Sequence, residues 1–524
     1  MTADAVIDPA TLVPGALEAG IFRDRSISVL GFARSGLALA RFLHDAGASV
    51  SVYDACPADE LARAIDALGR RPVRLLLGPD VDPAAAVAGA ALVTASPSIN
   101  PDYPTTEPRL RAVLADLVAR RAAGDGTAPA IVSEVDLFLR LCPAPTVGIT
   151  GTKGKTTTSA LAHALLAAAI GDRAVLGGNI GIPLIERLPD LTTAHRVVVE
   201  LSELQLPTLS RGTTVAAYTN VTADHLDRHG SLEAYQRVKR RLAELVDPSG
   251  AIVINLDDPV VARYGAATDA RTIQYRRGEH PDGGLGVDHG WIVADAITPI
   301  DGLNDPSGVL ATKTFEGGRI LPLAELAIPG AHNVSNALAA VAVALLFGVA
   351  PAAIRRGAAT FVGVEHRLER VAELDGVRFI NDSQGTQPDA VIAALKAFDG
   401  PIVLIAGGRD KGVDLTGLAA VAGRRAAAAV LIGESGPSLE GLFRDAGLAV
   451  TERAATLDDA VRAADRLARE ARAALAARHG PAAGAGPATV LLSPAAASFD
   501  MFEDYEARGR AFKQSVATLI EERG

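Results

Sequence analysis

Thr150-Gly151-Thr152-Lys153-Gly154-Lys155-Thr156-Thr157 follows a short apolar run and precedes an apolar-periodic segment, Thr158–Ala169. Its glycines let backbone N–H groups approach a phosphate, and the start of a helix adds positive potential there. In such a loop Lys155 reaches the outer phosphates and Thr156 ligates Mg²⁺. Because Ile149 precedes it, the G-x-x-x-x-G-K-[ST] pattern is incomplete. The stretch predicts a shortened phosphate loop between a strand and a helix; the alternative is a Gly-rich turn that binds nothing.

A second nucleotide-binding pattern lies nearer the N-terminus. A strand, a glycine turn, a helix and a second strand are expected at Ser26–Leu30, Gly31–Gly36, Leu37–Ala46 and Ala48–Tyr53. The second strand ends at Asp54, and this order is typical of a βαβ nucleotide-binding unit. Ala33 stands where G-x-G-x-x-G has its second glycine. A dinucleotide-dependent oxidoreductase is therefore disfavoured, although it stays an alternative.

The remaining chain alternates short apolar runs with helical patterns, which predicts mostly parallel sheets with crossover helices. We expect an α/β protein of three domains: a Rossmann-like N-terminal domain, a central P-loop ATPase-like domain and a Rossmann-like C-terminal domain. Their expected bounds are residues 1–140, 141–364 and 365–524, with residues 1–25 as an extension. Residues 270–325 predict a β-rich elaboration. Further strands are expected at 91–95, 145–150, 196–200, 215–219, 250–254, 377–380, 401–406, 429–432 and 488–493, and a helix at 333–347.

Composition narrows the class of protein. At roughly 100–200 residues per domain, 524 residues correspond to two to four domains. Apolar residues make up 49% of the chain and charged residues 21%, which excludes a mostly disordered protein. The net charge of −10 disfavours a nucleic-acid partner. The chain has only two cysteines, which predicts a cytoplasmic protein. It shows neither a basic and apolar leader nor a long apolar run, so no membrane span is expected.

Polar residues gather after the expected strands of the central block, where ligands bind in open α/β sheets. Glu200 ends one strand and is followed by Ser202 and Gln205. It is either a Mg²⁺ ligand or an ordinary surface carboxylate. The segment Thr219–His229 places two His and two Asp within six residues. Lys239 lies beyond it on an expected helix and, taken alone, is one of several surface cations.

Three later clusters are also candidates. Gly330–Asn336 places two amides ahead of a helix, for which helix capping is the plainer explanation. Val364–Glu369 puts Arg367 at a domain junction. Ile380–Thr386 and Ala406–Lys411 follow expected strands, and their glycines and charges suit either a ligand crevice or ordinary turns.

Nine motifs follow one another from Thr150 to Gly509, within a resemblance that covers the chain from about residue 26. They are TGTKGKTT (150–157), GGNIG (177–181), ELSELQL (200–206), TNVTADHLDRHGS (219–231), GAHNVSNALAA (330–340), EHRLE (365–369), NDSQGT (381–386), AGGRDKG (406–412) and SPAAASFDMFEDYEARG (493–509). In this order they resemble the Mur ligase family of ATP-dependent amide-forming enzymes, and in particular its glutamate-adding members.

The resemblance implies a three-step reaction in peptidoglycan precursor synthesis. ATP phosphorylates the alanyl carboxylate of UDP-N-acetylmuramoyl-L-alanine, the amine of glutamate attacks the acyl phosphate, and phosphate leaves. D-Glutamate is the expected amino acid, ATP and two Mg²⁺ ions are the expected cofactors, and a monomer is expected. The alternatives are a Mur-type ligase that uses L-glutamate or another amino acid, and a P-loop NTPase that drives a conformational change.

The resemblance also implies roles for individual residues. Lys155, Glu200, His225 and Lys239 are the implied catalytic set, and Lys239 corresponds to the family lysine that becomes carbamylated. The implied metal ligands are Thr156, Glu200, His225 and carbamylated Lys239. The implied ATP contacts are Gly151, Thr152, Lys153, Gly154, Lys155, Thr156, Thr157, Asn333, Asn336, Arg367 and Asp382. The implied substrate contacts are Arg34, Ser35, Asp54, Ser96, Ser98, Asn179, Ser202, Gln205, Thr386, Lys411, Ser498, Phe499 and Tyr505.

The sequence departs from the family pattern near the implied glutamate site. Gln384 stands where a lysine is usual, Gly385 replaces a small Ala, and Tyr505 stands where Phe is more usual. Loss of that lysine removes a cation near the incoming amino acid. The identity and enantiomer of the amino acid are therefore the open part of the prediction.

Overall fold

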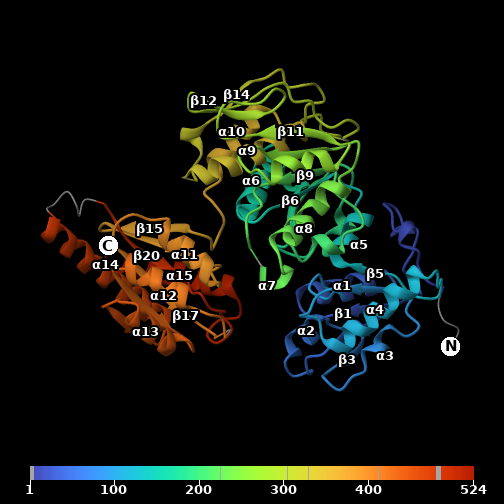
Figure 1. Ribbon diagram of the computed structural model, residues 1–524, viewed down its shortest axis with the longest axis horizontal. Helices are drawn as coiled ribbons and strands as arrows, with labels where there is room; N and C mark the ends of the chain where they lie inside the picture. Colours follow the sequence, from blue (N-terminus) through green and yellow to red (C-terminus); the bar gives the residue numbers. More distant parts are fainter. Residues whose placement is uncertain are drawn as a thin grey trace. The chain divides into compact units, whose positions relative to one another are not determined.

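A computed structural model describes residues 5–224, 226–303, 305–328, 330–410, 412–479 and 486–523. The chain forms two compact units, residues 1–361 and 362–524. The first unit holds two sheets and the second unit holds one, and helices cover the faces of each sheet (Figure 1). The expected multi-domain α/β fold is confirmed.

The first sheet of unit 1 is parallel and has the strand order β3-β2-β1-β4-β5. Its strands are short, and most of their buried positions are apolar. Separate apolar clusters lie on its two faces, one built around α1 and the other around α3 and α4. The elements are β1 (Ser26–Leu30), α1 (Arg34–Asp45), β2 (Ser49–Asp54), α2 (Ala62–Ala67), β3 (Arg74–Leu77), α3 (Pro83–Val87), β4 (Leu92–Ala95), α4 (Pro108–Ala122), β5 (Ile131–Ser133) and α5 (Glu134–Leu141).

The expected N-terminal extension is packed against the first sheet from residue 5 onward. Ile7, Leu12, Ala16 and Phe22 are buried in the same apolar cluster as α1. Phe22 also meets Phe42 edge to face, with ring centroids 6.2 Å apart. This segment is therefore part of the hydrophobic core of unit 1.

The second sheet of unit 1 has nine strands in the order β14-β13-β12-β11-β10-β9-β6-β8-β7. The pairings along the sheet from β7 to β12 are parallel, whereas the β12–β13 and β13–β14 pairings are antiparallel. The β-rich part of 270–325 thus extends the central sheet at its edge. The strands are β6 (Thr146–Thr150), β7 (Ala174–Gly178), β8 (Arg196–Glu200), β9 (Val215–Tyr218), β10 (Ala251–Asn255), β11 (Arg271–Tyr275), β12 (Leu285–Asp288), β13 (Trp291–Ala294) and β14 (Gly318–Pro322).

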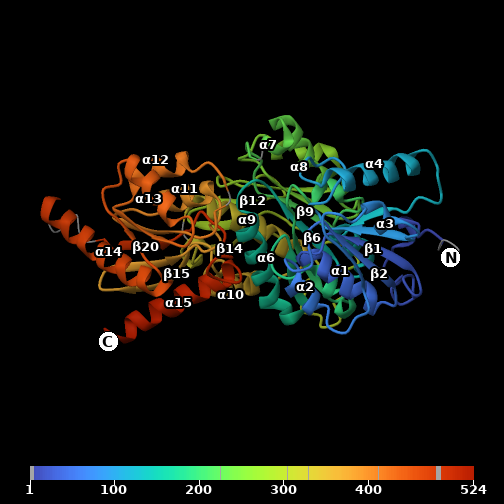
Figure 2. The ribbon, with the colours of Figure 1, turned by 90° about the horizontal axis from the view of Figure 1, so that it is seen from below.

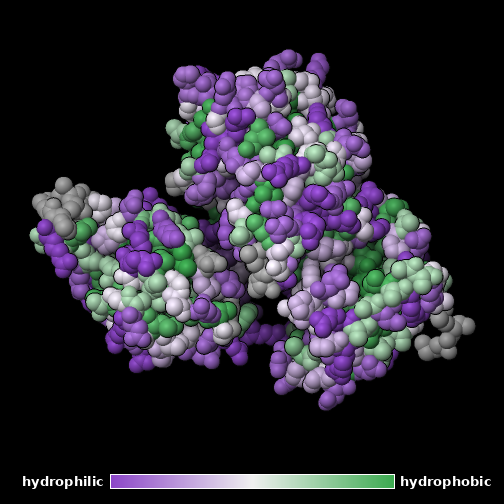
Figure 3. Space-filling view, in the orientation of Figure 1, coloured by the Kyte–Doolittle hydropathy of each residue, from purple (hydrophilic) through white to green (hydrophobic). Residues whose placement is uncertain are grey.

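Helices on the nine-stranded sheet carry or support the phosphate loop. Helix α6 packs against α9 and α10, and α9 is almost wholly buried from its sixth residue on. Hydrophilic side chains cover much of the surface over the β12–β14 edge (Figure 3). The helices are α6 (Lys155–Ile170), α7 (Leu226–His229), α8 (Leu232–Leu245), α9 (Ala331–Leu346) and α10 (Pro351–Thr360).

Unit 2 has a six-stranded sheet in the order β15-β16-β20-β17-β18-β19, parallel except for β15. Helices α11, α12 and α13 cover one face, and α14 and α15 cover the other (Figure 2). The elements are β15 (Glu369–Leu374), β16 (Val377–Asn381), α11 (Pro388–Lys396), β17 (Ile402–Gly407), α12 (Thr416–Arg425), β18 (Ala428–Ile432), α13 (Gly436–Asp445), β19 (Thr451–Arg453), α14 (Leu457–His479), β20 (Ala488–Leu492) and α15 (Tyr505–Glu521).

Candidate active site

The phosphate loop joins β6 to α6 in the centre of the nine-stranded sheet. Gly154 has φ +86° and precedes the first residue of α6, so a residue with a side chain would be strained there. A Cβ at this position would also lie 2.4 Å from Asn336 Oδ1. Lys155 Nζ donates to the carbonyls of Gly151 (3.1 Å) and Thr152 (2.9 Å), which holds the ammonium over the loop.

The segment after β9 supports the loop from the side. The Thr152 N–H donates to the Asn220 carbonyl (2.7 Å), and the Lys153 N–H donates to Asn220 Oδ1 (3.0 Å). The Thr222 N–H donates to Thr152 Oγ1 (3.0 Å), which also contacts the Tyr235 hydroxyl at 3.1 Å. Asn220 and Tyr235 were not predicted individually, although Asn220 lies in a motif that was.

Glu200 ends β8, the strand next to β6, and is 1% exposed. Its Oε1 accepts a hydrogen bond from Asn179 Nδ2 (2.8 Å), and its backbone carbonyl accepts one from the Asn179 N–H (2.9 Å). Its Oε2 is buried and has no hydrogen-bond partner. A buried carboxylate oxygen without a donor is unfavourable unless a cation or ligand meets it.

Lys239 is fully buried, so the alternative of a surface cation is wrong. Its Nζ donates to Thr150 Oγ1 (3.3 Å) and lies 5.5 Å from the ring centroid of Tyr235. Burial, reinforced by the nearby Lys155 ammonium, lowers the pKa of Lys239 to about 7. Its neighbour Arg240 is instead exposed and pairs with Glu244 at 2.8 Å. The structure thus separates Lys239 from the arginines beside it in sequence.

The two amides of the GAHNVSN motif lie at the first turns of α9, against the phosphate loop. Asn336 is 4% exposed, and its Oδ1 accepts a hydrogen bond from Thr158 Oγ1 in α6 (3.2 Å). Its Nδ2 donates to Asn333 Oδ1 at 3.0 Å. Asn336 therefore joins α9 to α6, which simple capping of α9 does not explain.

Ser202 and Gln205 contact each other in the turn after β8. The Ser202 N–H and hydroxyl both donate to Gln205 Oε1, at 2.9 and 3.0 Å. Their side chains therefore stabilise the backbone beside Glu200.

Two predicted residues, His225 and Lys411, lie outside the described residues. Within the part of the chain that is described, no three His, Cys, Asp or Glu side chains are grouped to hold a metal ion. The described helices include none that is long and apolar enough to cross a membrane.

The predicted UDP-binding residues lie at the carboxyl edge of the first sheet. Asp54, at the end of β2, accepts the Phe32 N–H through Oδ2 (2.7 Å) and the Cys56 N–H through Oδ1 (2.9 Å). It therefore fixes the glycine turn that leads into α1, whose first two residues are Arg34 and Ser35. Ser96 and Ser98 follow β4, with their hydroxyls 3.3 Å apart. These five side chains gather at one edge, as predicted for ligands of open α/β sheets.

In unit 2, Asp382 follows β16 and is 5% exposed. Its Oδ1 accepts the Leu368 N–H (3.1 Å) and its Oδ2 accepts the Ser493 hydroxyl (2.6 Å). Burial raises the pKa of Asp382 to about 6. Arg367 lies between His366 and Leu368, which have φ +63° and +46°. The structure therefore places Arg367 on a strained loop held by Asp382.

The described residues of the predicted amino-acid site follow two adjacent parallel strands, β16 and β20. Thr386 follows β16; its N–H donates to the Gln384 carbonyl at 2.8 Å. Ser498 and Phe499 follow β20; Ser498 is buried and Phe499 is 66% exposed. Tyr505 begins α15, and its carbonyl accepts the Ser383 hydroxyl at 2.7 Å.

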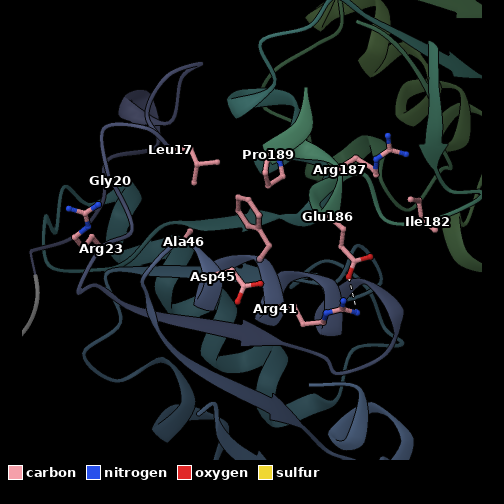
Figure 4. A pocket seen from close by; sticks show the side chains of 11 residues that line it. Leu17, Gly20, Arg23, Arg41, Asp45, Ala46, Ile182, Glu186, Arg187 and Pro189 are labelled. Atoms are coloured by element: carbon pink, nitrogen blue, oxygen red, sulfur yellow. Dashed lines mark ion pairs between the residues drawn. The ribbon is translucent and has the colours of Figure 1, made fainter. Parts of the chain in front are cut away.

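A pocket of about 670 Å³ lies elsewhere in unit 1 (Figure 4). It is lined by Leu17 and Arg23 of the N-terminal segment, by the C-terminal half of α1 and by the segment from Ile182 to Pro189. The Arg41–Glu186 ion pair (3.3 Å) crosses it. The pocket shares no residue with the predicted site, and its position at the far end of α1 from Arg34 separates the two.

Comparison with known proteins decides the family. The chain is 36% identical over 507 residues to the UDP-N-acetylmuramoylalanine–D-glutamate ligase of Symbiobacterium thermophilum, covering 96% of this chain and 100% of that protein. It is 38% identical over 499 residues to the enzyme of the same name from Roseiflexus, covering 94% and 97%. The chain belongs to the Mur ligase family. It is therefore a member of a family of ATP-dependent, amide-forming ligases.

Two domain families map onto this Mur ligase. Residues 149–344 match the Mur ligase middle domain, and residues 366–477 match the Mur ligase glutamate ligase domain. In fold, the chain is similar to the UDP-N-acetylmuramate–alanine ligase of Thermotoga maritima, with a TM-score of 0.50, 17% identity and coverage of 94% of this chain and 99% of that one. The middle-domain match contains the phosphate loop, Glu200, Lys239 and the amides of α9.

Proposed function

We propose that this Mur ligase joins D-glutamate to UDP-N-acetylmuramoyl-L-alanine with hydrolysis of ATP, in the synthesis of peptidoglycan precursors. The observation that carries the proposal is the full-length similarity to relatives named for this reaction. The reaction would proceed through an acyl phosphate on the alanyl carboxylate. We also propose that the protein acts in the cytoplasm as a monomer.

The phosphate loop would hold the triphosphate of ATP. Its backbone N–H groups and the start of α6 suit an anion, and Lys155 Nζ needs only to exchange two carbonyl partners for phosphate oxygens. Attack by a carboxylate on the γ-phosphate brings two anions together, so aligned positive charge would lower the barrier. The implied ATP contacts from Gly151 to Thr157 all lie on this loop and the first turn of α6.

The residues around Glu200 fit a Mg²⁺ site. The buried, unpartnered Glu200 Oε2 is the observation that supports it, since hard oxygen ligands are what Mg²⁺ prefers. Thr156 would add a hydroxyl ligand, and His225 would serve a second ion. Bound Mg²⁺ would reduce the charge repulsion between the triphosphate and the attacking carboxylate. Asn179 would keep Glu200 oriented through the hydrogen bond to Oε1.

Lys239 would carry a carbamate. A lysine reacts with CO₂ only as the neutral amine, and the lowered pKa of the buried Lys239 makes that form abundant near pH 7. The carbamate would convert a buried cation beside the phosphate loop into an anion that suits a metal-rich site.

The other ligands would bind at strand ends of the remaining sheets. Residues 1–140 would bind the UDP end of the precursor through Arg34, Ser35, Asp54, Ser96 and Ser98. Residues 141–364 would bind ATP, with Asn333 and Asn336 toward the adenine, and Ser202 and Gln205 would contact the substrate from the turn after β8. Residues 365–524 would contribute Arg367 and Asp382 to ATP and would hold glutamate through Thr386, Lys411, Ser498, Phe499 and Tyr505.

A phosphate-release assay with ATP, Mg²⁺ and UDP-N-acetylmuramoyl-L-alanine tests the proposal. D-Glutamate should stimulate phosphate release and give a product one glutamyl residue heavier by mass spectrometry. L-Glutamate and a panel of other amino acids should be tested in parallel. Gln384 stands where a lysine is usual, and the absence of that lysine removes a charge near the amino acid. Absence of product with either glutamate enantiomer would refute the proposed reaction. Equal ATP hydrolysis with no precursor present would support the NTPase alternative.

A further inference from the structure

Arg508 is a buried arginine behind the three strand-end loops of the proposed amino-acid site. It lies in the first turn of α15 and is 1% exposed. Its Nε donates to the Ser383 hydroxyl (3.0 Å) and its Nη2 donates to the Ser383 carbonyl (3.0 Å). Both Nη atoms donate to the Ala496 carbonyl, each at 3.3 Å. One side chain thus joins the loop after β16 to the loop after β20.

The third loop also contacts this guanidinium. A Cβ on Gly408, which follows β17, would lie 3.2 Å from Arg508 Nη1 and 2.2 Å from the Ala497 carbonyl. Gly408 has φ +142°, so glycine lets this loop close over the arginine. Because β16, β20 and β17 are adjacent, the guanidinium lies where all three loops meet.

Within the described part of the chain, the charge of Arg508 has no direct counter-ion. Among the ion pairs of the described residues none involves Arg508, and Asp500 acts on it only at longer range. Burial lowers the pKa of Arg508 to about 10, which still leaves the guanidinium charged at neutral pH. A buried cation that meets only carbonyl and hydroxyl dipoles is costly, and an arriving carboxylate would offset that cost.

Gln384 lies next to Ser383 on the first of these loops. Its amide carries no charge, and its Oε1 is buried without a hydrogen-bond partner. The side chain at this position therefore contributes no cation to the loops. The described residues of the proposed site, Thr386, Ser498, Phe499 and Tyr505, are also uncharged.

We propose that Arg508 is a positioning residue for amino-acid binding, which holds the three loops together and supplies the positive potential that residue 384 lacks here. This inference rests on the proposed function, since it assigns the loops to a dicarboxylic amino acid. The guanidinium acts through the loops and attracts the carboxylates of the amino acid across them.

Steady-state kinetics of the full-length protein test this role. Arg508→Met keeps the side-chain length and removes the charge; it should raise the KM for D-glutamate by about 10-fold or more, because hydrogen bonds and attraction to charged groups are worth a factor of this size. The KM values for ATP and the UDP precursor should change less than about twofold. Arg510→Met, an exposed change two residues along α15, is the matched control and should leave all three KM values unchanged.

A second-site lysine separates charge from packing. Gln384→Lys in the Arg508→Met background should recover at least about a third of the lost glutamate affinity if Arg508 acts through its charge. If Gln384→Lys restores no glutamate affinity and Arg508→Met raises the KM of all three substrates equally, the electrostatic role is overturned. If Arg508→Met does not fold, Arg508→Lys is measured instead, because it keeps the positive charge. A folded Arg508→Lys protein whose KM for glutamate is raised about 10-fold would also overturn the electrostatic role of Arg508.

Calorimetric titration distinguishes this inference from the proposed function. If the wild-type protein forms no amide with glutamate, the proposed reaction fails by itself. Titration of D-glutamate into the wild-type protein and Arg508→Met, both with a non-hydrolysable ATP analogue, then judges Arg508 separately. Weaker binding by the variant supports the role of Arg508, whereas equal binding, or none by either protein, overturns it.

Discussion

Lys155 and Lys239 are both lysines of the candidate site, but their surroundings give them different chemistry. Lys155 donates to two loop carbonyls and lies close to the proposed triphosphate. Lys239 is fully enclosed, and its hydrogen-bond partner is a hydroxyl. The surroundings of Lys155 suit a cation beside phosphate, whereas the burial of Lys239 favours the neutral amine. Their substitutions should therefore fail in different ways.

Lys155→Ala should reduce kcat by about 100-fold or more, because one preorganised charge aimed at the transferred phosphoryl group is lost. Phosphate release under saturating substrates measures the effect. Lys313→Ala is the comparison, since Lys313 is exposed and lies outside the proposed site; this variant should lose much less activity. Similar losses in both variants would contradict the assignment of Lys155.

Lys239→Met should stabilise the protein at neutral pH. In the unfolded chain the lysine pKa is near its ordinary 10.5, and in the folded protein it is about 7, so between these values the unfolded state binds more protons. The wild-type protein therefore gains stability as pH rises from 7, and the variant lacks this gain. We expect an advantage of about 4 kcal/mol for Lys239→Met at pH 7.

Urea unfolding in CO₂-depleted buffer from pH 7 to 9 measures that advantage, which should shrink as the pH rises. Arg240→Met is the control: Arg240 is half-exposed, so its substitution should give no such trend. A constant or growing advantage would show that Lys239 is charged in the folded protein.

Lys239→Ala should lose activity and recover part of it with added formate or acetate. A small carboxylate would take the place of the proposed carbamate in the cavity left by the side chain. The recovery should saturate with carboxylate concentration, while chloride at the same ionic strength should have no effect. A variant that keeps full activity without any added acid would rule out the carbamate.

Single residues show how far sequence alone reaches. Lys239 was predicted as a catalytic residue from the family resemblance, but its burial was not predicted. Without the packing of α8, Arg237, Arg240 and Arg241 are equally plausible cations. Arg508 lies in the motif at 493–509 but was not predicted individually, since its partners are 12 and 125 residues away in the chain. The spacing of residues along a helix or strand predicts only which residues of that element are neighbours. The contacts of Arg508 join separate elements, so this spacing cannot predict them.

At the scale of elements, strands were predicted better than helix starts. β1 and β8 have the predicted bounds, because each contains apolar, β-branched residues that favour a buried strand. In contrast, α1 begins at Arg34 and α6 at Lys155, each three residues before the predicted start. The first turns of these helices are polar because they face the proposed ligands, so apolar periodicity begins only after them.

Gly154, at the start of α6, lies against Asn336 of α9, so its substitution should disturb the contact between the two helices. Gly154→Ala should raise the KM for ATP by about 10-fold or more, because a left-handed residue with a Cβ costs about 1–2 kcal/mol and the Cβ would also displace Asn336. Gly124→Ala is the matched control: its φ is +84°, and nothing lies within 4 Å of its Cβ. It should lower stability without changing the KM for ATP.

Gly154→Ala combined with Asn336→Ala separates the two costs. The double variant keeps the strained φ but removes the collision with Oδ1, so part of the ATP affinity should return unless Asn336 itself binds the nucleotide. A double variant that binds ATP more weakly than either single variant would indicate direct contact between Asn336 and the nucleotide.

At the scale of the whole molecule, three sheets correspond to the three α/β blocks read from the sequence, and two of them share one compact unit. The sequence could not indicate this sharing, because it depends on contacts such as Arg140 Nη2 with Ser210 Oγ (2.6 Å) across 70 residues. Residues 270–325 were predicted to be β-rich, but their union with the central sheet depends on pairing of β11 with β12.

Separate cores in the two units predict two unfolding transitions in differential scanning calorimetry of the full chain. The apolar clusters of unit 2 consist of unit-2 residues alone, so each unit can unfold cooperatively by itself. At 100 times its Kd, the UDP precursor should raise the free energy of unfolding of unit 1 by about 2.7 kcal/mol. The free energy of unfolding of unit 2 should not change. Arg508→Met should lower only the unfolding temperature of unit 2, since among the described residues its hydrogen-bond partners, Ser383 and Ala496, belong to that unit. A single transition that responds to both changes would mean that the two units unfold as one, and the loops around Arg508 would then be coupled to the precursor site through the whole molecule.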